Sequence, residues 1–331
     1  MRREPLIIGA GPAGCAAAIT LARAGCQPLL IERTSKPMDK VCGDFLSADT
    51  IQRLRGLGVD PAALGASVIG RVRLIHQERI AEAALPFPAM GLPRRVLDDA
   101  LLRRAAEAGA VVLGGRSVRH LTRQEGGWCV EADGMEPMLA ETVFLATGKH
   151  DLRDMPRPRS DNDAVGMKMY FIPGLEAARR LDDATELTLF PGGYAGLQAV
   201  ENGRAVLCIA LRRAAFQACG GSWDRLLTAI GDTSQRFSGM LQGAIPLLPR
   251  PLAVAGIPYG YQARPASPDG LFRLGDQAAV IPSLTGDGMA IALHSGQAAA
   301  GAWLERAGSA AYHRTLRRTL APQMRLARWL H

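Results

Sequence analysis

The chain has 331 residues, 48% of them hydrophobic and 21% charged, which is enough for two domains with buried cores and excludes a disordered protein. Its net charge of +8 comes almost entirely from dispersed arginines without interleaved aromatics. This argues against nucleic acid as a partner but suits an anionic cofactor, an acidic carrier protein or a peripheral membrane contact. The cysteines and histidines lack ligand or disulfide spacing, and we expect no signal peptide or membrane span, so the sequence predicts a cytoplasmic protein without metal.

The first predicted strand (5–8) runs into a glycine-rich turn that opens an alanine-rich helix (16–22). A second strand (27–31) ends at Glu32, at the distance where an acidic side chain binds ribose hydroxyls. Phosphates would lie on the free N–H groups at the helix N-terminus. The turn holds the glycines of the dinucleotide-binding spacing together with two intervening residues: Gly9, Gly11, Pro12, Ala13 and Gly14.

Helices and short strands continue to alternate as far as residue 146. A polar loop (36–47) precedes a helix over 48–57, and a second helix runs from Arg95 to Ala108. The predicted strands of this part cover 68–75, 80–85, 110–113, 128–132 and 141–146. The last of them ends in the turn Ala146, Thr147 and Gly148.

The middle of the chain changes to strand-like runs separated by turn signals. Asn202-Gly203 between two apolar runs predicts a hairpin. The expected strands, which form an antiparallel sheet, cover 167–172, 185–190, 195–200 and 205–211. One helix (223–237) follows, then a strand (272–274) that ends at Gly275 and Asp276, a helix as far as 305, and a basic helix over 310–330.

Four separated segments together resemble FAD-dependent enzymes of the para-hydroxybenzoate hydroxylase fold. They are the first turn with Glu32 and Arg33, the helix with Arg95 and Asp98, the 146–148 turn, and Gly275-Asp276 with Pro282 and Gly286-Asp287-Gly288. Within that fold, Lys40-Val41-Cys42-Gly43 and the run from Gly275 to Met289 resemble the geranylgeranyl reductase-like branch.

The resemblance implies an α/β fold, with a discontinuous Rossmann-type FAD-binding domain, an inserted antiparallel β-rich substrate domain and a C-terminal helix. We expect the FAD-binding domain in 1–70, 94–160 and 256–305. The substrate domain would comprise 71–93 and 161–255, and the C-terminal helix 306–331.

The resemblance also implies roles for individual residues. Glu32 would hold the adenosine ribose, and Arg95 and Asp276 would reach the ribityl or phosphate portion of FAD. The turn from Thr285 to Met289 would place backbone N–H groups near the pyrimidine edge of the flavin, where a helix N-terminus stabilises negative charge. Taken singly, Arg95 also fits an exposed helix charge, and Asp276 and Asp287 also fit turn residues.

Cys42 is the candidate for chemistry. It would lie on the substrate side of the flavin, where its thiol would donate or relay a proton or shape the pocket. A small buried hydrophobe is the other reading, because free cysteines commonly pack in this way.

The resemblance implies an FAD-dependent oxidoreductase that acts on an apolar or polyketide-like small molecule, by hydride transfer to or from a carbon–carbon bond. NAD(P)H or another external reductant would supply the electrons. The alternatives are a monooxygenase that hydroxylates or epoxidises through a flavin hydroperoxide, and a non-catalytic flavin-binding protein. No feature of the sequence sets an oligomeric state.

Overall fold

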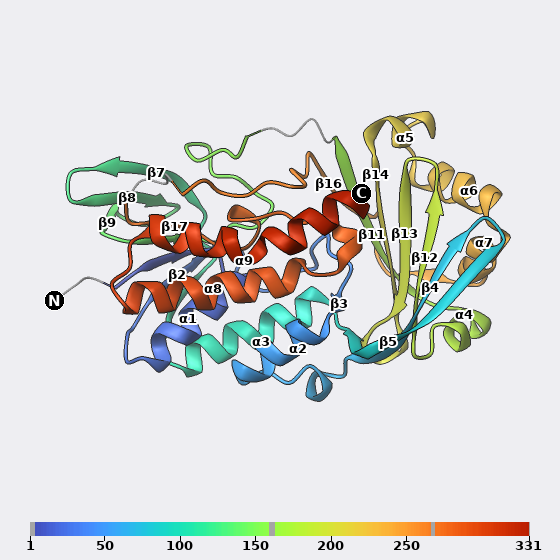
Figure 1. The fold of residues 1–331 in the computed structure, drawn as a ribbon, viewed down its shortest axis with the longest axis horizontal. Coiled ribbons are helices and arrows are strands. Elements are labelled where there is room, and N and C mark those ends of the chain that lie inside the picture. The colour runs from blue at the N-terminus through green and yellow to red at the C-terminus, as the bar shows by residue number, and fades with distance from the viewer. Residues whose placement is uncertain (1–3, 159–162, 266–268, 331) are drawn as a thin grey trace.

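The computed structural model describes residues 4–158, 163–265 and 269–330. One layer is built on a five-stranded parallel sheet in the order β17-β10-β1-β2-β6, and a larger sheet stands beside it (Figure 1). The strands of the parallel sheet are β1 (Leu6–Ile8), β2 (Leu29–Glu32), β6 (Val111–Gly114), β10 (Val143–Leu145) and β17 (Leu271–Arg273). They come from distant parts of the sequence, so this layer is assembled from separate chain segments.

Helices pack with the parallel sheet in one hydrophobic core. They are α1 (Pro12–Arg23), α2 (Ala48–Gly56), α3 (Arg94–Glu107), α8 (Gly288–Leu304) and α9 (Ser309–Leu330). The C-terminal helix α9 contributes its inner face to this core, through residues such as Leu316 and Leu320. Among the described residues, no helix combines the length and apolar character that crossing a membrane requires.

A three-stranded antiparallel sheet lies at one end of this layer (Figure 1). Its strands are β7 (Val118–Gln124), β8 (Gly127–Ala132) and β9 (Met138–Ala140). The sequence predicted β8 but missed β7 and β9. β7 is rich in polar, exposed residues and β9 has only three residues, so pairing with β8 rather than an alternating pattern holds them in the sheet.

The second layer is a nine-stranded sheet in the order β15-β11-β14-β13-β12-β4-β5-β3, with β16 also paired to β11. The prediction of an antiparallel sheet is confirmed with one exception, since β12 pairs with β4 in parallel. Asn202 and Gly203 both adopt positive φ at the turn between β13 and β14, as the predicted hairpin requires. The strands are β3 (Phe45–Leu46), β4 (Ser67–His76), β5 (Arg79–Gly91), β11 (Ala164–Ile172), β12 (Ala184–Phe190), β13 (Gly193–Ala199), β14 (Ala205–Arg212), β15 (Ile245–Pro246) and β16 (Leu252–Ala255).

Short helices lie on the face of this sheet that points away from the parallel layer (Figure 1). They are α4 (Leu175–Arg180), α5 (Arg213–Ala218), α6 (Trp223–Thr233) and α7 (Gln235–Leu241). The single helix expected over 223–237 was wrong, because Ser234 has an extended backbone and breaks it in two. Its side chain accepts a hydrogen bond from the backbone N–H of Phe237 and so caps α7.

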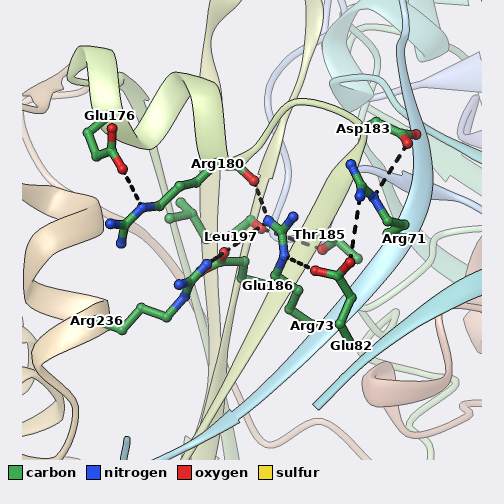
Figure 2. A network of polar contacts seen from close by, with 10 residues as sticks. All are labelled: Arg71, Arg73, Glu82, Glu176, Arg180, Asp183, Thr185, Glu186, Leu197 and Arg236. Carbon is green, nitrogen blue, oxygen red and sulfur yellow. Dashed lines mark hydrogen bonds and ion pairs between the residues drawn. The ribbon is translucent and has the colours of Figure 1, made fainter. Parts of the chain in front are cut away.

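A polar network ties this outer face together (Figure 2). Buried Glu186 on β12 accepts hydrogen bonds from Arg73 on β4 and from Arg236 on α7, at 3.3 Å from Arg73 Nη1 and 3.1 Å from Arg236 Nε. Arg73 also donates to Glu82 on β5 and to the carbonyl oxygen of Arg180. The network therefore joins three strands to the helices that cover them.

Candidate functional site

The glycine-rich turn forms a close-packed loop between β1 and α1. A Cβ atom on Gly14 would lie 1.9 Å from the carbonyl oxygen of Gly9, and one on Gly9 would lie 2.5 Å from the carbonyl oxygen of Ala146. Gly11 precedes Pro12 at the first position of α1, and among the described residues no side chain caps this helix end. Its N–H groups are therefore available to an anion such as a diphosphate.

Glu32 lies at the end of β2 beside this turn. Its Oε2 accepts a hydrogen bond from the Ala10 N–H at 2.8 Å, and its Oε1 accepts from the N–H of Thr34 at 3.2 Å and from its hydroxyl at 3.0 Å. The carboxylate is thus held against the turn, where we propose that it meets a ribose. Arg33, the next residue, is exposed.

Two neighbouring arginines at the start of α3 have different environments. Arg94 is largely buried and makes a two-point ion pair with Asp98, with Nε–Oδ1 at 2.8 Å and Nη2–Oδ2 at 2.9 Å. Although burial favours its neutral form, Asp98 raises the pKa of Arg94, so the guanidinium stays charged. A Cβ on Gly11 would be 3.7 Å from Arg94 Nη2, so this charge lies beside the glycine-rich turn.

Arg95 lies elsewhere. Its side chain is 45% exposed and 3.9 Å from Asp39 and 3.8 Å from Glu201. The sequence pattern predicted a cofactor contact for Arg95 and none for Arg94. The signal that would have found it is the i,i+4 spacing of Arg94 and Asp98, which puts both side chains on one side of the helix.

A second uncapped helix end lies at α8. Asp287 precedes it without a side-chain cap among the described residues, and a Cβ on Gly288 would meet no described atom within 4 Å. In the preceding turn, Gly286 has a φ of +72°. A Cβ atom on Gly286 would lie 2.9 Å from the ring of Phe45, so there is no room for a side chain. Met289 is buried in the core, so only its backbone could serve a ligand.

The Gly275-Asp276 segment is fixed from two directions. The N–H of Gly275 donates to Ser295 Oγ at 2.8 Å, and the carbonyl oxygen of Asp276 accepts from Arg157 at 2.8 Å. Arg157 also donates to the carbonyl oxygen of Lys149, so it joins this segment to the one that follows Gly148. Asp276 itself is partly exposed and Pro282 is buried. Thr147 anchors its own turn by donating to the carbonyl oxygen of His150.

The segment that carries Cys42 is held by hydrogen bonds to its backbone. The Cys208 thiol on β14 donates to the carbonyl oxygen of Cys42 at 3.0 Å, and Lys149 Nζ donates to that of Val41 at 2.7 Å. Lys40 Nζ pairs with Asp98 at 3.0 Å. The Cys42 side chain is partly buried, between the parallel layer and the larger sheet.

A buried ion pair lies next to the Cys42 segment. Asp44 and Lys168 are both fully buried, with Nζ 2.7 Å from Oδ2, and Tyr170 donates its hydroxyl to the same oxygen at 2.6 Å. Lys168 also donates to the carbonyl oxygen of Lys40. Burial lowers the pKa of Lys168, but Asp44, together with Cys208 and Cys42, raises it by more, so the ammonium remains charged. The sequence alone does not indicate this pair, because nothing in a strand pattern marks a buried lysine or its distant partner.

The large sheet presents an apolar row toward the parallel layer. The row crosses five paired strands, with one residue from each. In order across β4, β12, β13, β14 and β11, they are Leu74, Leu187, Gly196, Cys208 and Lys168. Because paired residues share one face, this row leads from Leu74 to the contact under Cys42. Leu74 is 40% exposed, and Leu187, Gly196 and Cys208 are partly exposed.

The next row on the same face meets the turn before α8. Leu189 pairs with Tyr194, which pairs with Ala210. Tyr194 donates its hydroxyl to Ser283 at 2.9 Å, and the hydroxyl of Tyr259 is 2.6 Å from the same Ser283 oxygen. The Cys42 segment and the Ser283 turn therefore touch the sheet on adjacent rows, about 7 Å apart along a strand.

These features fit FAD. The uncapped N-terminus of α1 and the charge of Arg94 suit a diphosphate, and the uncapped N-terminus of α8 suits an electron-rich ring edge. Glu32 suits a ribose. The close packing at Gly9 and Gly14 leaves no room for side chains in the turn. The apolar row of the large sheet lies next to the Cys42 segment. Among the described residues, no group of three or more His, Cys, Asp or Glu could hold a metal ion.

Comparison with known proteins agrees with this geometry. Residues 2–136 match the model of a family described as "FAD binding domain". The chain is 27% identical over 322 residues to digeranylgeranylglycerophospholipid reductase 2 of Methanopyrus kandleri, covering 90% of this chain and 76% of that protein. It is 26% identical to the menaquinone reductase of Mycolicibacterium smegmatis, with the same two coverages. The flavin-dependent brominase Bmp2 shares the fold, with a TM-score of 0.78 at 17% identity, over 96% of this chain and 80% of that one.

Proposed function

We propose that this chain, an FAD-dependent oxidoreductase of the para-hydroxybenzoate hydroxylase fold that resembles the geranylgeranyl reductase-like branch, reduces a carbon–carbon double bond of an apolar, isoprenoid-like substrate. Residues 1–70, 94–160 and 256–305 would hold FAD, and 71–93 and 161–255 would hold the substrate. NAD(P)H would serve as external reductant. All six cysteines are free in the structure, which supports a reducing, cytoplasmic compartment.

The observation that carries the proposal is the apolar row from Leu74 to Cys208. It begins at an exposed strand and ends under the Cys42 segment. Leu74, Leu187 and Gly196 bring no hydrogen-bonding side chain to this row, so this part of the face suits an extended hydrocarbon better than a polar substrate. Named relatives act on a digeranylgeranylglycerophospholipid and on menaquinone, which points to the same substrate chemistry.

Reduced FAD supplies the hydride for such a reaction. The chain must supply a proton to the neighbouring carbon, so that a C=C bond becomes CH–CH with one hydride and one proton added. The Cys42 thiol is the candidate donor, because its segment is fixed by Cys208 and Lys149 beside the apolar row. The thiolate left on Cys42 would be stabilised by the positive charges of Lys168 and Arg94. Water would then return a proton to the thiolate.

The shared fold with a flavin-dependent brominase keeps a monooxygenase as the second candidate. The test mixes anaerobically reduced holoenzyme with a detergent-dispersed prenylated quinone and follows flavin absorbance and product mass. A product with two added hydrogens, formed without oxygen, supports the reductase. A product with one added oxygen atom, formed only after oxygen is admitted, supports the monooxygenase. Turnover of neither kind favours a flavin-binding protein.

Gly196 offers a test of the substrate wall. A Cβ there would lie 3.3 Å from Leu187, so Gly196→Leu would fill the row without touching the FAD cradle. We expect a rise in KM that grows with prenyl chain length and an unchanged flavin content. Gly239→Leu on α7, on the other face of the sheet, is the matched control, because a Cβ there would meet no described atom within 4 Å. Equal loss for short and long substrates would contradict the assignment of this face.

The role of Cys42 is tested in the same assay. Cys42→Ser keeps a weaker acid in place and Cys42→Ala removes it. If the thiol donates the proton, the alanine variant should slow reoxidation of reduced enzyme by substrate about 100-fold and change its pH dependence. An unchanged pH profile with normal flavin binding would show that Cys42 only packs.

A further inference from the structure

The C-terminal helix α9 has two faces of different character. Its buried positions recur at helical spacing and pack on the core of the parallel layer, and they are Tyr312, His313, Leu316, Leu320, Met324 and Ala327. The opposite face carries Arg314, Arg318, Arg325 and Trp329, all exposed. Their spacing of four, seven and four residues places them within one narrow arc directly away from the core.

This outer stripe is both basic and apolar. Trp329 is 82% exposed, and Leu326 beside it is 60% exposed. Residues 309–330 contain no Asp or Glu, so no acidic residue within α9 neutralises the arginines. From Arg314 to Trp329 the stripe is about 22 Å long. The arginines of such a stripe are attracted to anionic headgroups, and a tryptophan and a leucine at one end of it can enter the headgroup layer.

Folding does not account for the stripe. The helix dipole favours a cation near the last turns, as at Arg325, but it gives no advantage to Arg314 or Arg318 in the first half. Core packing does not account for Trp329 or Leu326 either, because the buried positions of α9 are complete without them. Trp329 and Leu326 lie one helical turn apart, so they form one contiguous apolar patch beside the arginines rather than scattered single side chains.

The far end of α9 lies beside the candidate site. Gln323 makes a side-chain hydrogen bond to Asp287, which counteracts the rise that burial causes in the pKa of that carboxyl. Asp287 precedes α8, at the uncapped end that we assign to the flavin. Leu326 and Trp329 follow one and two turns later. In Figure 1 the C-terminus lies at the junction of the two layers.

We infer that the outer stripe of α9 docks the protein on an anionic lipid bilayer, with Trp329 and Leu326 inserted between headgroups next to the substrate site. The inference rests on the proposed function, since an isoprenoid substrate is dissolved in the bilayer rather than in water. The arginines supply attraction to anionic headgroups, and the indole supplies a side chain that is apolar with one polar edge. Docking would bring the N-terminus of α8, which we assign to the flavin, close to the bilayer that contains the substrate.

The test uses the purified holoenzyme and sedimentation with vesicles. It should bind vesicles that contain phosphatidylglycerol, bind phosphatidylcholine vesicles weakly, and dissociate as salt rises. Arg318→Gln with Arg325→Gln should weaken binding about tenfold or more, and Trp329→Ser several-fold. The matched controls are Leu175→Ser, also 82% exposed, and Arg179→Gln, both on α4 at the other layer; they should bind as the unmodified chain does.

A second measurement needs no destabilising change. Brominated lipids should quench the tryptophan emission of the unmodified chain on anionic vesicles, and Trp329→Phe should abolish most of that quenching. Three outcomes overturn the inference: no binding to anionic vesicles, equal loss in the α4 controls, or a Trp329→Ser variant that turns a dimer into a monomer in light scattering. Flavin content and turnover of detergent-dispersed substrate report on the proposed function separately, because neither requires a bilayer.

Discussion

Lys168 on β11 and Asp44 in the segment after Cys42 form an ion pair with both side chains fully buried and Nζ 2.7 Å from Oδ2. Lys168 lies on β11 and Asp44 lies directly before β3, so the two residues are 124 positions apart in the sequence. The pair therefore joins the apolar sheet to the segment that carries the candidate proton donor. Tyr170 and the N–H of Arg94 donate to the same carboxylate, so its lone pairs are well occupied.

Breaking this pair should destabilise the protein. Lys168→Met leaves the Asp44 carboxylate buried without its cation, and we expect a loss of about 3–5 kcal/mol in the free energy of unfolding, measured in urea. Lys168→Met combined with Asp44→Asn should lose clearly less than the sum of the single changes. The exposed Arg119–Asp133 pair is the control, where the same double-variant cycle should show little coupling. Additive losses at Lys168 and Asp44 would contradict a coupled pair.

The two arginines at the start of α3 should differ in their effect on FAD. Arg94→Gln removes the charge beside Gly11 and should raise the dissociation constant for FAD at least about tenfold. Arg95→Gln, on the exposed side, should leave it within about threefold. Fluorescence titration of the apoprotein with FAD measures both. The opposite ranking would support the assignment made from sequence and reject the one made from the structure.

Glu186 should stabilise the attachment of α7 to the sheet. Glu186→Ala leaves Arg73 and Arg236 without their shared carboxylate, and both side chains are mostly buried (Figure 2). We expect a loss of about 3 kcal/mol in unfolding free energy and faster amide exchange in 235–241. Glu176→Ala removes an exposed carboxylate that pairs with Arg180 and should change stability by less than about 0.5 kcal/mol. Equal effects of the two substitutions would refute a structural role for the network.

His313 should make the protein sensitive to mild acid. Burial, with a further contribution from Arg273, lowers the pKa of this imidazole to about 4. Its Nε2 accepts a hydrogen bond from the Arg273 N–H, which requires the unprotonated ring. The unfolded chain binds a proton near pH 6.5 and the folded chain does not, so stability falls between about pH 6.5 and pH 4, by roughly 3 kcal/mol.

His313→Gln provides the comparison, because glutamine can accept the same hydrogen bond but does not titrate. The variant should be less stable at pH 7.5, and its melting temperature should fall less steeply than that of the unmodified chain between pH 6.5 and pH 4. Parallel melting curves over this range would exclude His313 as the source of the acid sensitivity.

The local patterns of the sequence determined much of the fold. The glycine-rich turn with an apolar strand before it, the alanine-rich helix and the strand that ends at Glu32 predicted the cofactor-binding layer, because turn geometry and helix periodicity act over a few residues. Ser234, which splits one expected helix into two, shows the limit. A serine both interrupts and caps helices, and only the packing of α6 and α7 on the sheet selects between these roles.

Other features were decided only by tertiary structure. The i,i+4 spacing of Arg94 and Asp98 is present in the sequence, but only the packing of α3 beside the turn places Arg94 next to Gly11. The row from Leu74 to Lys168 depends on the register of five strands, one pair of them parallel, which no local pattern encodes. Burial of Lys168 beside Asp44 follows from that register, since a charge can leave water only where a distant partner is already in place.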